Sequence, residues 1–367
     1  MNNDMKKITI IAGARPNFMK IAPIIHAILK AKSEGHPIDY RLVHTGQHYD
    51  NNMSGSFFEQ LEIPEPHENL ACSGGTQAEQ TAAILINFEK ELMAHPADVV
   101  LVVGDVTSTM ACALVAQKLH TKVAHVEGGI RSDDWSMPEE INRLVTDSIT
   151  NYFFTTSDTA NANLKQSGVK ADQIFFVGNT MIDTLLKQRP NFTQPKVWNA
   201  LGLTEGAYIV MTLHRPANVD EESQLKAMLD EIITNTQNLP LIFPVHPRTA
   251  KILERLNVRH SRLHMVAPLS YLEFNYLVEK AKAVITDSGG ITEEASIMRV
   301  PCLTLRDNTE RPETITLGTN ELVGTDPKKL KPFLKKLFAG DWKKGHEIPL
   351  WDGKTAERIV AVLVNEL

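Results

Sequence analysis

The sequence predicts an α/β protein made of two doubly wound domains. Short apolar, β-branched runs alternate along the chain with longer amphipathic stretches. The runs are continuously apolar, which is typical of parallel strands covered by helices on both faces. The alternation lapses once, over residues 188–206, and then restarts, and 367 residues exceed one ordinary core. We therefore expect two doubly wound domains that face each other across a central cleft.

The first half of the chain supplies one series of strands and helices. Thr76 and Glu79 have capping-box spacing, so a helix is expected to begin there. Lys6 and Lys7 before the apolar stretch Ile8–Ala14 also suit a secretory leader, but that stretch is short, and a buried first strand fits better. The expected strands are Ile8–Ile11, Tyr40–Val43, Val99–Val103, Val123–Val126 and Ile174–Val177, and the expected helices are Ile21–Lys30, Gln77–Met93, Met110–His120 and Asn142–Ile149.

The second half repeats the pattern. Gln188–Gly206 is polar and contains Pro190 and Pro195, which suits a connection between domains. We expect domains over residues 1–178 and 179–350, with a terminal helix over 354–367 that packs back on the first domain. The expected strands of the second domain are Ala207–Met211, Leu241–Val245, His264–Val266, Ala283–Thr286 and Pro301–Thr304.

Composition and charge exclude several classes of function. The chain has 38 basic and 44 acidic residues, a net charge of -6, and such a surface repels a nucleic-acid backbone. No apolar run approaches the ~20 residues that cross a bilayer, so no membrane partner is expected. The three cysteines form no C-x-x-C pair or His-rich cluster. We expect reduced thiols in a cytoplasmic protein and no zinc site.

Acidic residues follow neighbouring elements of the first domain. Asp105 comes after the strand Val99–Val103, Glu127 after Val123–Val126, and Glu139 stands in the first turn of a later helix. Taken singly, Asp105 suits a helix cap and Glu139 complements a helix dipole. Glu127 has no such explanation. Ligands bind beyond the carboxyl ends of parallel strands, so the three carboxylates together predict a catalytic site.

Cations and glycines follow the strands of the second domain. Two of these strands are followed by His214-Arg215 and by His246-Pro247-Arg248. A later helix, which contains Glu294, begins with Ser288-Gly289-Gly290. Arg15 and Lys20 bracket a similar turn in the first domain. Free amides at a helix N-terminus and nearby cations suit an anionic ligand such as a diphosphate. Arg306 and the charged run 309–313 complete the series.

Several common enzyme motifs are absent from the sequence. It contains no G-x-G, no G-x-x-x-x-G-K-[ST] phosphate loop, no H-E-x-x-H and no G-x-S-x-G. These absences argue against an ordinary dehydrogenase, a kinase, a metalloprotease and an esterase.

An ordered set of motifs resembles the non-hydrolysing UDP-N-acetylglucosamine 2-epimerases over nearly the full length of the chain. The motifs are Gly13–Pro16, His44–Asp50, Gly104-Asp105, His125–Arg131, Pro138–Arg143, His214-Arg215, Asp287–Glu294 and Thr309–Glu313. The resemblance implies a pair of Rossmann-like domains of the GT-B type, a homodimer, no cofactor and no metal. It implies reversible conversion of UDP-N-acetylglucosamine to UDP-N-acetylmannosamine.

The resemblance also assigns roles to residues. Asp105, Glu127, Glu139 and His214 match the family's catalytic groups. A second set is expected to bind the nucleotide and its diphosphate, with Glu294 on the ribose hydroxyls. That set is Arg15, Lys20, His246, Ser288, Gly289, Gly290 and Glu294, and we add Arg306 to it as substrate-binding.

Chemistry restricts how such a reaction proceeds. The hydrogen on C2 of the sugar has no neighbouring carbonyl, so a carboxylate cannot simply remove it. Oxidation would need a nicotinamide, for which the sequence has no fingerprint. The remaining route breaks the bond from C1 to the diphosphate and eliminates UDP, with the 2-acetamidoglucal intermediate that the resemblance implies. Inversion then needs a proton on the opposite face, so one fixed base is insufficient unless the intermediate turns over, which predicts more than one carboxylate.

Some positions depart from the family pattern. Ala217 precedes Asn218 where a glutamate is frequent, Asp50 replaces a second glutamine, and 73–77 contains no arginine. Some bacterial members use that glutamine and arginine to bind substrate as an activator, so the resemblance does not extend to this regulation.

The sequence leaves other functions open. A UDP-2,3-diacetamido uronic acid 2-epimerase, a GT-B glycosyltransferase, a nucleotide-sugar sensor and a hydrolysing epimerase all suit parts of the pattern. A glycosyltransferase would need an acceptor, and a sensor would not need the three carboxylates.

Overall fold

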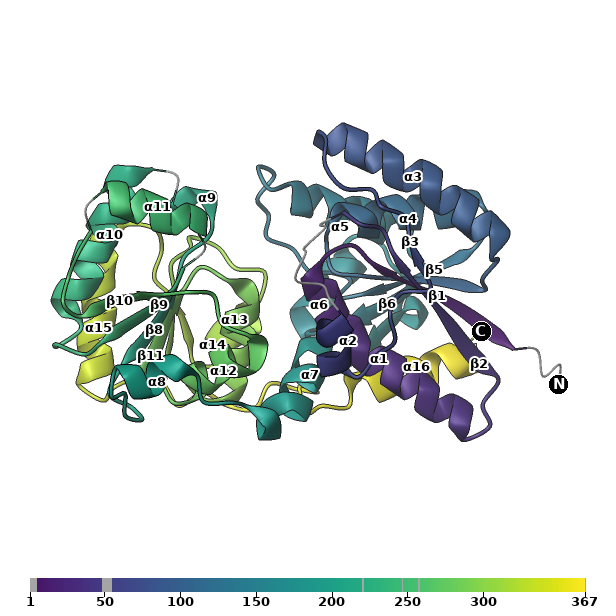
Figure 1. The fold of residues 1–367 in the computed structure, drawn as a ribbon. Coiled ribbons are helices and arrows are strands. Elements are labelled where there is room, and N and C mark those ends of the chain that lie inside the picture. Colours follow the sequence, from purple (N-terminus) through teal and green to yellow (C-terminus); the bar gives the residue numbers. More distant parts are fainter. Residues whose placement is uncertain (1–4, 48–54, 220, 246, 257, 367) are drawn as a thin grey trace. The chain divides into compact units, whose positions relative to one another are not determined.

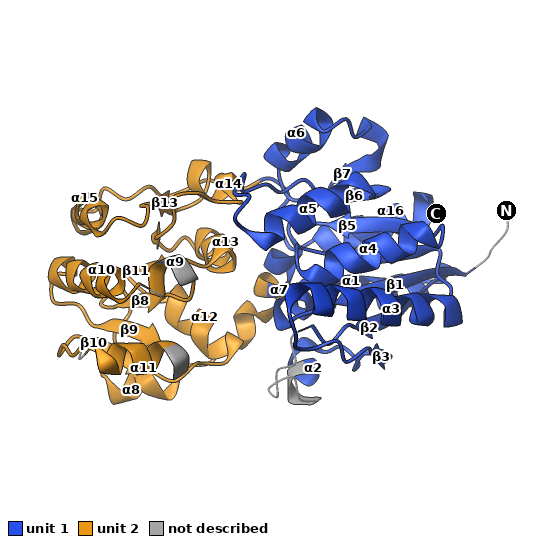
Figure 2. Cartoon of the chain, turned by 90° about the horizontal axis from the view of Figure 1, so that it is seen from above, with its two compact units in different colours: residues 1–184, 349–367 blue, residues 185–348 orange. Residues whose placement is uncertain are grey.

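The computed structural model describes residues 5–47, 55–219, 221–245, 247–256 and 258–366. The chain divides into two compact units (Figure 2). Unit 1 consists of residues 1–184 and 349–367, and unit 2 consists of residues 185–348. The division lies a few residues after the expected boundary at residue 178. The final segment of the chain is part of unit 1.

Unit 1 is built on a parallel sheet with the strand order β3-β2-β1-β4-β5-β6-β7. All of its described strand pairs are parallel, as the continuously apolar runs predicted. Every residue of β4 is buried, because helices cover both faces of the sheet. Its strands are β1 (Lys6–Ala12), β2 (Ile38–His44), β3 (Glu68–Asn69), β4 (Val99–Val103), β5 (Lys122–Val126), β6 (Tyr152–Thr155) and β7 (Ile174–Phe176).

The helices of unit 1 form two layers on this sheet. In Figure 1, α3, α4 and α5 cover one face, and α1 and α16 lie side by side on the other. Thr76 and Glu79 form the expected capping box at the start of α3. The helices are α1 (Arg15–Ser33), α2 (Gly55–Leu61), α3 (Gln77–Ala94), α4 (Thr107–Lys118), α5 (Pro138–Ser148), α6 (Asp158–Gln166), α7 (Thr180–Gln188), which reaches into unit 2, and α16 (Thr355–Glu366), with a 3₁₀ turn at Ala171–Gln173.

Unit 2 repeats the architecture on a parallel sheet of order β10-β9-β8-β11-β12-β13. Its core gathers Met211, Leu229, Phe243, Ile285 and Leu303 between the sheet and its helices. The strands are β8 (Ile209–Thr212), β9 (Leu241–Pro244), β10 (Leu263–Val266), β11 (Ala283–Thr286), β12 (Cys302–Thr304) and β13 (Asn320–Leu322). The helices are α8 (Lys196–Ala200), α9 (Pro216–Val219), α10 (Glu222–Asn235), α11 (Pro247–Arg255), α12 (Tyr271–Glu279), α13 (Gly289–Ile297), α14 (Pro312–Thr316) and α15 (Leu330–Phe338), with 3₁₀ turns at Arg189–Asn191 and Pro327–Lys329.

The segment 188–206 is more than a connection between domains. It lies within unit 2 and forms α8. The Trp198 ring packs edge-on against Tyr208 and Tyr276, with centroids 5.6 and 5.4 Å away. One aromatic residue therefore anchors an otherwise polar stretch, which hydropathy alone does not reveal.

No helix in the described part of the chain is long and apolar enough to cross a membrane.

Candidate active site

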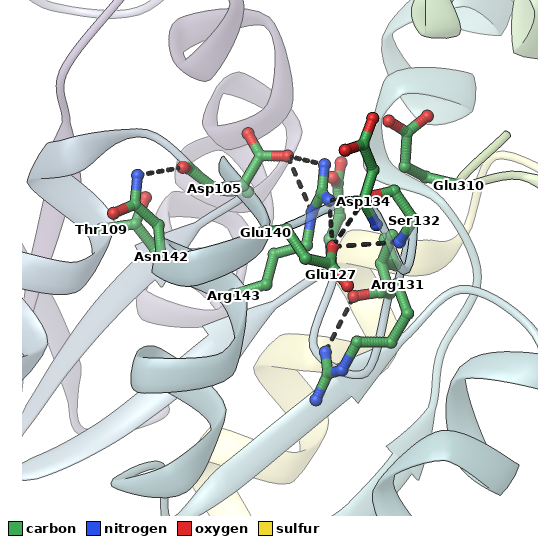
Figure 3. Close-up of polar contacts among 12 residues, drawn as sticks. Asp105, Thr109, Glu127, Arg131, Ser132, Asp134, Glu140, Asn142, Arg143 and Glu310 are labelled. Carbon is green, nitrogen blue, oxygen red and sulfur yellow. Dashed lines mark hydrogen bonds and ion pairs between the residues drawn. The ribbon is translucent and has the colours of Figure 1, made fainter. Parts of the chain in front are cut away.

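Two of the three carboxylates predicted in the first domain, Asp105 and Glu127, lie at the carboxyl edge of the unit 1 sheet. Strands β4 and β5 are neighbours, with Val103 opposite Val126. Asp105 follows the end of β4, and Glu127 follows directly after β5. The two turns are joined by a bond from the Gly104 N–H to the Val126 carbonyl, 3.1 Å long. Figure 3 shows the side chains around this edge.

Asp105 is held by an arginine of α5. Nε and Nη2 of Arg143 donate to its Oδ2, at 3.0 and 2.6 Å. The Asn142 amide donates to its main-chain carbonyl at 2.8 Å. Both Arg143 bonds use Oδ2, so Oδ1 stays without a partner in the described structure. Asp105 does not cap α4, whose N-cap residue is Val106, so the helix-cap interpretation is wrong.

Glu127 is a buried carboxylate in an unusual backbone conformation. Its φ of 72° lies in the left-handed region, which is uncommon for a non-glycine residue and costs conformational energy. The carboxylate is 4% exposed and accepts a 2.9 Å bond from the Lys20 ammonium group. Gly104 makes room for this pair, because a Cβ there would lie 3.3 Å from the Lys20 nitrogen. Lys20 is thus placed against Glu127.

The adjacent acids of α5 have different surroundings. Glu140 is buried and accepts bonds from the Ser132 N–H, the Ser132 hydroxyl and Arg143 (Figure 3). Burial alone would raise the pKa of Glu140, but these bonds outweigh it and lower the pKa. Glu139 is half-buried and makes no hydrogen bond or ion pair with the described residues. Glu140 therefore fixes the loop before α5, and the role predicted for Glu139 stays a prediction.

The cation and glycine turns of unit 2 meet at one buried carboxylate. Asp287, at the end of β11, is fully buried, and its Oδ1 lies 2.6 Å from Nδ1 of His214. It also accepts bonds from the Arg215 N–H and the Asn218 amide. Burial would raise the pKa of Asp287, but His214 and these donors outweigh it and lower the pKa. The His214 side chain is 60% exposed.

The turn Ser288-Gly289-Gly290 begins α13. A Cβ added to Gly289 or Gly290 would have open space around it. Unbonded amides at a helix N-terminus attract anions. The carboxylate of Glu294, on the same helix, is 4% exposed and accepts a 2.7 Å bond from the Tyr271 hydroxyl. Burial raises the pKa of Glu294 to about 7.

The remaining predicted residues have varied surroundings. Arg306 is buried and makes a bidentate pair with Glu310, at 2.6 and 2.7 Å, so it shapes the loop that follows β12. Arg15 is half-buried at the start of α1. His246 lies outside the described residues. Within the described ranges, no group of three His, Cys, Asp or Glu side chains could hold a metal ion.

A family model described as UDP-N-acetylglucosamine 2-epimerase matches residues 30–364. The chain belongs to this family. It is 42% identical to the UDP-N-acetylglucosamine 2-epimerase of Methanocaldococcus jannaschii, over 97% of this chain and 98% of that protein.

A solved structure of that enzyme and one further relative extend the comparison. The crystal structure of the M. jannaschii enzyme in complex with UDP-GlcNAc and UDP has a TM-score of 0.86, at 42% identity over 97% of this chain and 99% of that one. The UDP-2,3-diacetamido-2,3-dideoxy-D-glucuronate 2-epimerase of Pseudomonas aeruginosa is 41% identical over 87% of this chain and 88% of that protein. These likenesses confirm the predicted fold and family.

Sequence reasoning missed the residues that hold the predicted site residues and their turns in place. Arg143 and Asp287 stand in quoted motifs and Asp147 lies in an expected helix, but none of the three received a role. Their signal is a polar residue on the inward face of a helix or at a strand end, which hydrophobic periodicity does not detect. The structure places Asp105 on the turn beside the one that carries the Lys20–Glu127 pair in unit 1, and places His214 against Asp287, the residue before Ser288, in unit 2.

Proposed function

We propose that the protein interconverts UDP-N-acetylglucosamine and UDP-N-acetylmannosamine by eliminating and re-adding UDP. The observation that carries this proposal is the pair of cation-bound carboxylates, Asp105 and Glu127, on adjacent turns of one sheet edge. Proton transfer on two faces of one carbon needs two such groups. The sugar would contact the carboxylates of unit 1, and the uridine diphosphate would contact unit 2.

The proposed reaction has two halves. In the first, the bond from C1 to the diphosphate oxygen breaks, its electron pair leaves with UDP, and a carboxylate takes the C2 proton. The sugar becomes 2-acetamidoglucal, with a C1–C2 double bond. In the second, the diphosphate oxygen attacks C1 again, and C2 receives a proton on the opposite face. No oxidant is consumed.

Unit 2 supplies groups suited to the leaving diphosphate. A Cβ at Gly289 or Gly290 would have open space around it, so the N-terminus of α13 has room for an anion, and N–H groups there would stabilise the negative charge that develops on UDP. Asp287 occupies Nδ1 of His214, so Nε2 is the ring nitrogen that would meet a phosphate oxygen. Glu294 would accept bonds from the ribose hydroxyls.

A second substrate has specific support. The P. aeruginosa relative is a 2-epimerase of a UDP-2,3-diacetamido uronate, and its identity to this chain is nearly that of the M. jannaschii enzyme. The same elimination would serve both sugars, because neither substitution at C3 nor a carboxylate at C5 changes the bonds that break.

The test is incubation of the purified protein with each UDP-sugar, without acceptor or nicotinamide, followed by proton NMR. We expect UDP-N-acetylmannosamine to appear from UDP-N-acetylglucosamine. Asp105→Asn, which keeps the side chain's shape, should slow the reaction about 10²–10⁴-fold. Turnover of the diacetamido uronate alone would reassign the substrate, and release of free N-acetylmannosamine would indicate a hydrolysing enzyme. Inertness toward both sugars would refute the proposal.

We also propose that the enzyme acts as a homodimer, as the family resemblance implies. Light scattering of the purified protein measures this directly, and the mass of a single 40.9 kDa chain would contradict it.

A further inference from the structure

A buried histidine lies directly behind the two carboxylate turns. His125, on β5, is fully buried, and both of its ring nitrogens have close neighbours. Nδ1 lies 2.7 Å from Oδ1 of Asp147, on α5. Nε2 lies 2.8 Å from the main-chain carbonyl of Gly104, the residue before Asp105.

Both neighbours of the ring are hydrogen-bond acceptors. The Gly104 carbonyl has no proton to give, so Nε2 must donate. Asp147 is ionised, because its other oxygen accepts bonds from the Gly129 N–H at 3.0 Å and from Arg131 at 2.6 Å. Burial would raise the pKa of Asp147, but His125 and Arg131 outweigh it and lower the pKa. Nδ1 must therefore donate as well, and the ring is an imidazolium.

The His125–Asp147 pair connects the turn that carries Asp105 with the turn that carries Glu127. At one end the imidazolium holds the residue before Asp105. At the other end Asp147 holds Gly129, in the turn that begins at Glu127. Gly129 has little freedom to move, since a Cβ there would lie 2.4 Å from the Ala160 carbonyl. Neither His125 nor Asp147 touches a carboxylate that would act on substrate.

We propose that the His125–Asp147 ion pair is a positioning device that fixes the spacing between Asp105 and Glu127 and so sets the balance of proton delivery to the two faces of C2. The proposal rests on the epimerase function proposed above. It concerns His125 and Asp147 as positioning residues, because they act through the main chain of the two turns.

The balance between the faces can be measured separately from the rate. In heavy water, each elimination ends in deuterated epimer or in returned substrate, according to the face that receives the proton. The ratio of deuterium in the two sugars at early conversion depends on the geometry around C2. It does not depend on how much enzyme is folded.

His125→Gln is the direct test. The glutamine amide donates from one nitrogen only, so it cannot serve Gly104 and Asp147 together. We expect kcat to fall about 10²-fold, which is the usual cost of a misplacement of 1 Å, and the deuterium ratio to shift from its wild-type value. UDP affinity should stay unchanged, because the residues to which His125 and Asp147 bond are not among those assigned to UDP. An unchanged ratio would overturn the proposal, whatever the rate.

The matched control is Ile84→Ala, in the apolar cluster of α3, α4 and the sheet. It creates a cavity in the same unit away from the two turns. We expect it to lower the folded fraction and leave the ratio at its wild-type value. A shift of the ratio in Ile84→Ala equal to that in His125→Gln would show a general effect of instability and would overturn the proposal.

A measurement on the unmodified protein covers the case in which His125→Gln does not fold. Nitrogen-15 NMR of histidine-labelled enzyme distinguishes an imidazolium from a neutral ring. We expect one buried ring with protons on both nitrogens, which disappears in Asp147→Asn. A neutral His125 ring would refute the ion pair. Absence of deuterium from both sugars with the wild-type enzyme would instead refute the proposed function.

Discussion

At the residue scale, unit 1 pairs three of its acids with cations. Lys20 pairs with Glu127, and Arg143 serves both Asp105 and Glu140. Burying an ion without a partner costs several kcal/mol, so each pairing is a condition for placing a base beside a sugar. The left-handed φ of Glu127 adds local strain, which persists only where the surroundings enforce it.

Removal of the Arg143 guanidinium should destabilise unit 1. Arg143→Met leaves the buried Glu140 without its cation and is expected to cost about 3–5 kcal/mol. Hydrogen exchange of the unit 1 sheet measures the loss. The control is Lys32→Met, which removes the exposed pair with Asp39 and should change little. Equal effects of the two variants would contradict the role given to Arg143.

The raised pKa of Glu294 predicts a pH dependence of substrate binding. Burial raises this pKa to about 7, so the folded protein holds the proton at pH 6 and loses it at pH 8. Ribose hydroxyls donate to the ionised form, so affinity for UDP-N-acetylglucosamine should fall as pH drops below 7. The affinity should fall by at most tenfold for each pH unit. Calorimetry from pH 5.5 to 8.5 tests this, and Glu294→Gln should remove the slope. A slope that survives in Glu294→Gln would assign it to another group.

At the element scale, the sequence predicted the helices and strands that are defined by buried apolar residues. It missed the parts of elements that depend on buried polar residues. The continuously apolar run of β4 was predicted with its observed bounds. The amphipathic pattern of α5 covered only Asn142–Ile149, although Glu139 was placed in a first helical turn, and the helix begins at Pro138. The pattern misses the first turn because the buried residues of α5 include Glu140, Asn142, Arg143 and Asp147. These polar side chains are buried because they bond to one another and to the turns of the candidate site. Hydrophobic periodicity does not detect such bonds.

Short strands were missed for a related reason. β6 and β13 were not predicted, since Tyr152–Thr155 is short and Asn320–Leu322 carries polar residues. The site residues were found by their position after strands, while their partners had no signal of their own. Asp105 was identified in this way, and Arg143 was not.

The return of the chain to unit 1 depends on a carboxylate of α7. Asp183 accepts bonds from the Thr355 and Ala356 N–H groups, at 3.2 and 2.8 Å, and so caps α16. Asp183→Ala should cost about 1–2 kcal/mol, the usual value of such a cap. Hydrogen exchange of the α16 amides should speed up about tenfold. Exchange at the wild-type rate would show that packing on α1 alone holds the helix.

At the scale of the whole molecule, the two units carry different halves of the proposed chemistry. Unit 1 holds the carboxylates, and unit 2 holds the open helix N-terminus with His214. Each set is built at the carboxyl edge of its own parallel sheet, where ligands bind in such folds. The division of labour predicts that binding and proton transfer can be impaired separately.

A charge placed in unit 2 should impair binding alone. A side chain at Gly290 has open space, so Gly290→Asp should fold normally. Its negative charge would oppose the diphosphate and weaken UDP affinity, by about tenfold for a coupling of 1.4 kcal/mol. Gly290→Asn is the uncharged control. Equal UDP affinity in Gly290→Asp and wild type would show that the diphosphate does not bind at the N-terminus of this helix.

The central claim is that loss of UDP makes the hydrogen on C2 exchangeable. The most direct measurement is proton NMR of UDP-N-acetylglucosamine incubated with the enzyme in heavy water. We expect the product, UDP-N-acetylmannosamine, to carry deuterium at C2 from its first appearance. Formation of the epimer with its original hydrogen still at C2 would show that the hydrogen does not exchange and would refute elimination followed by reprotonation from solvent.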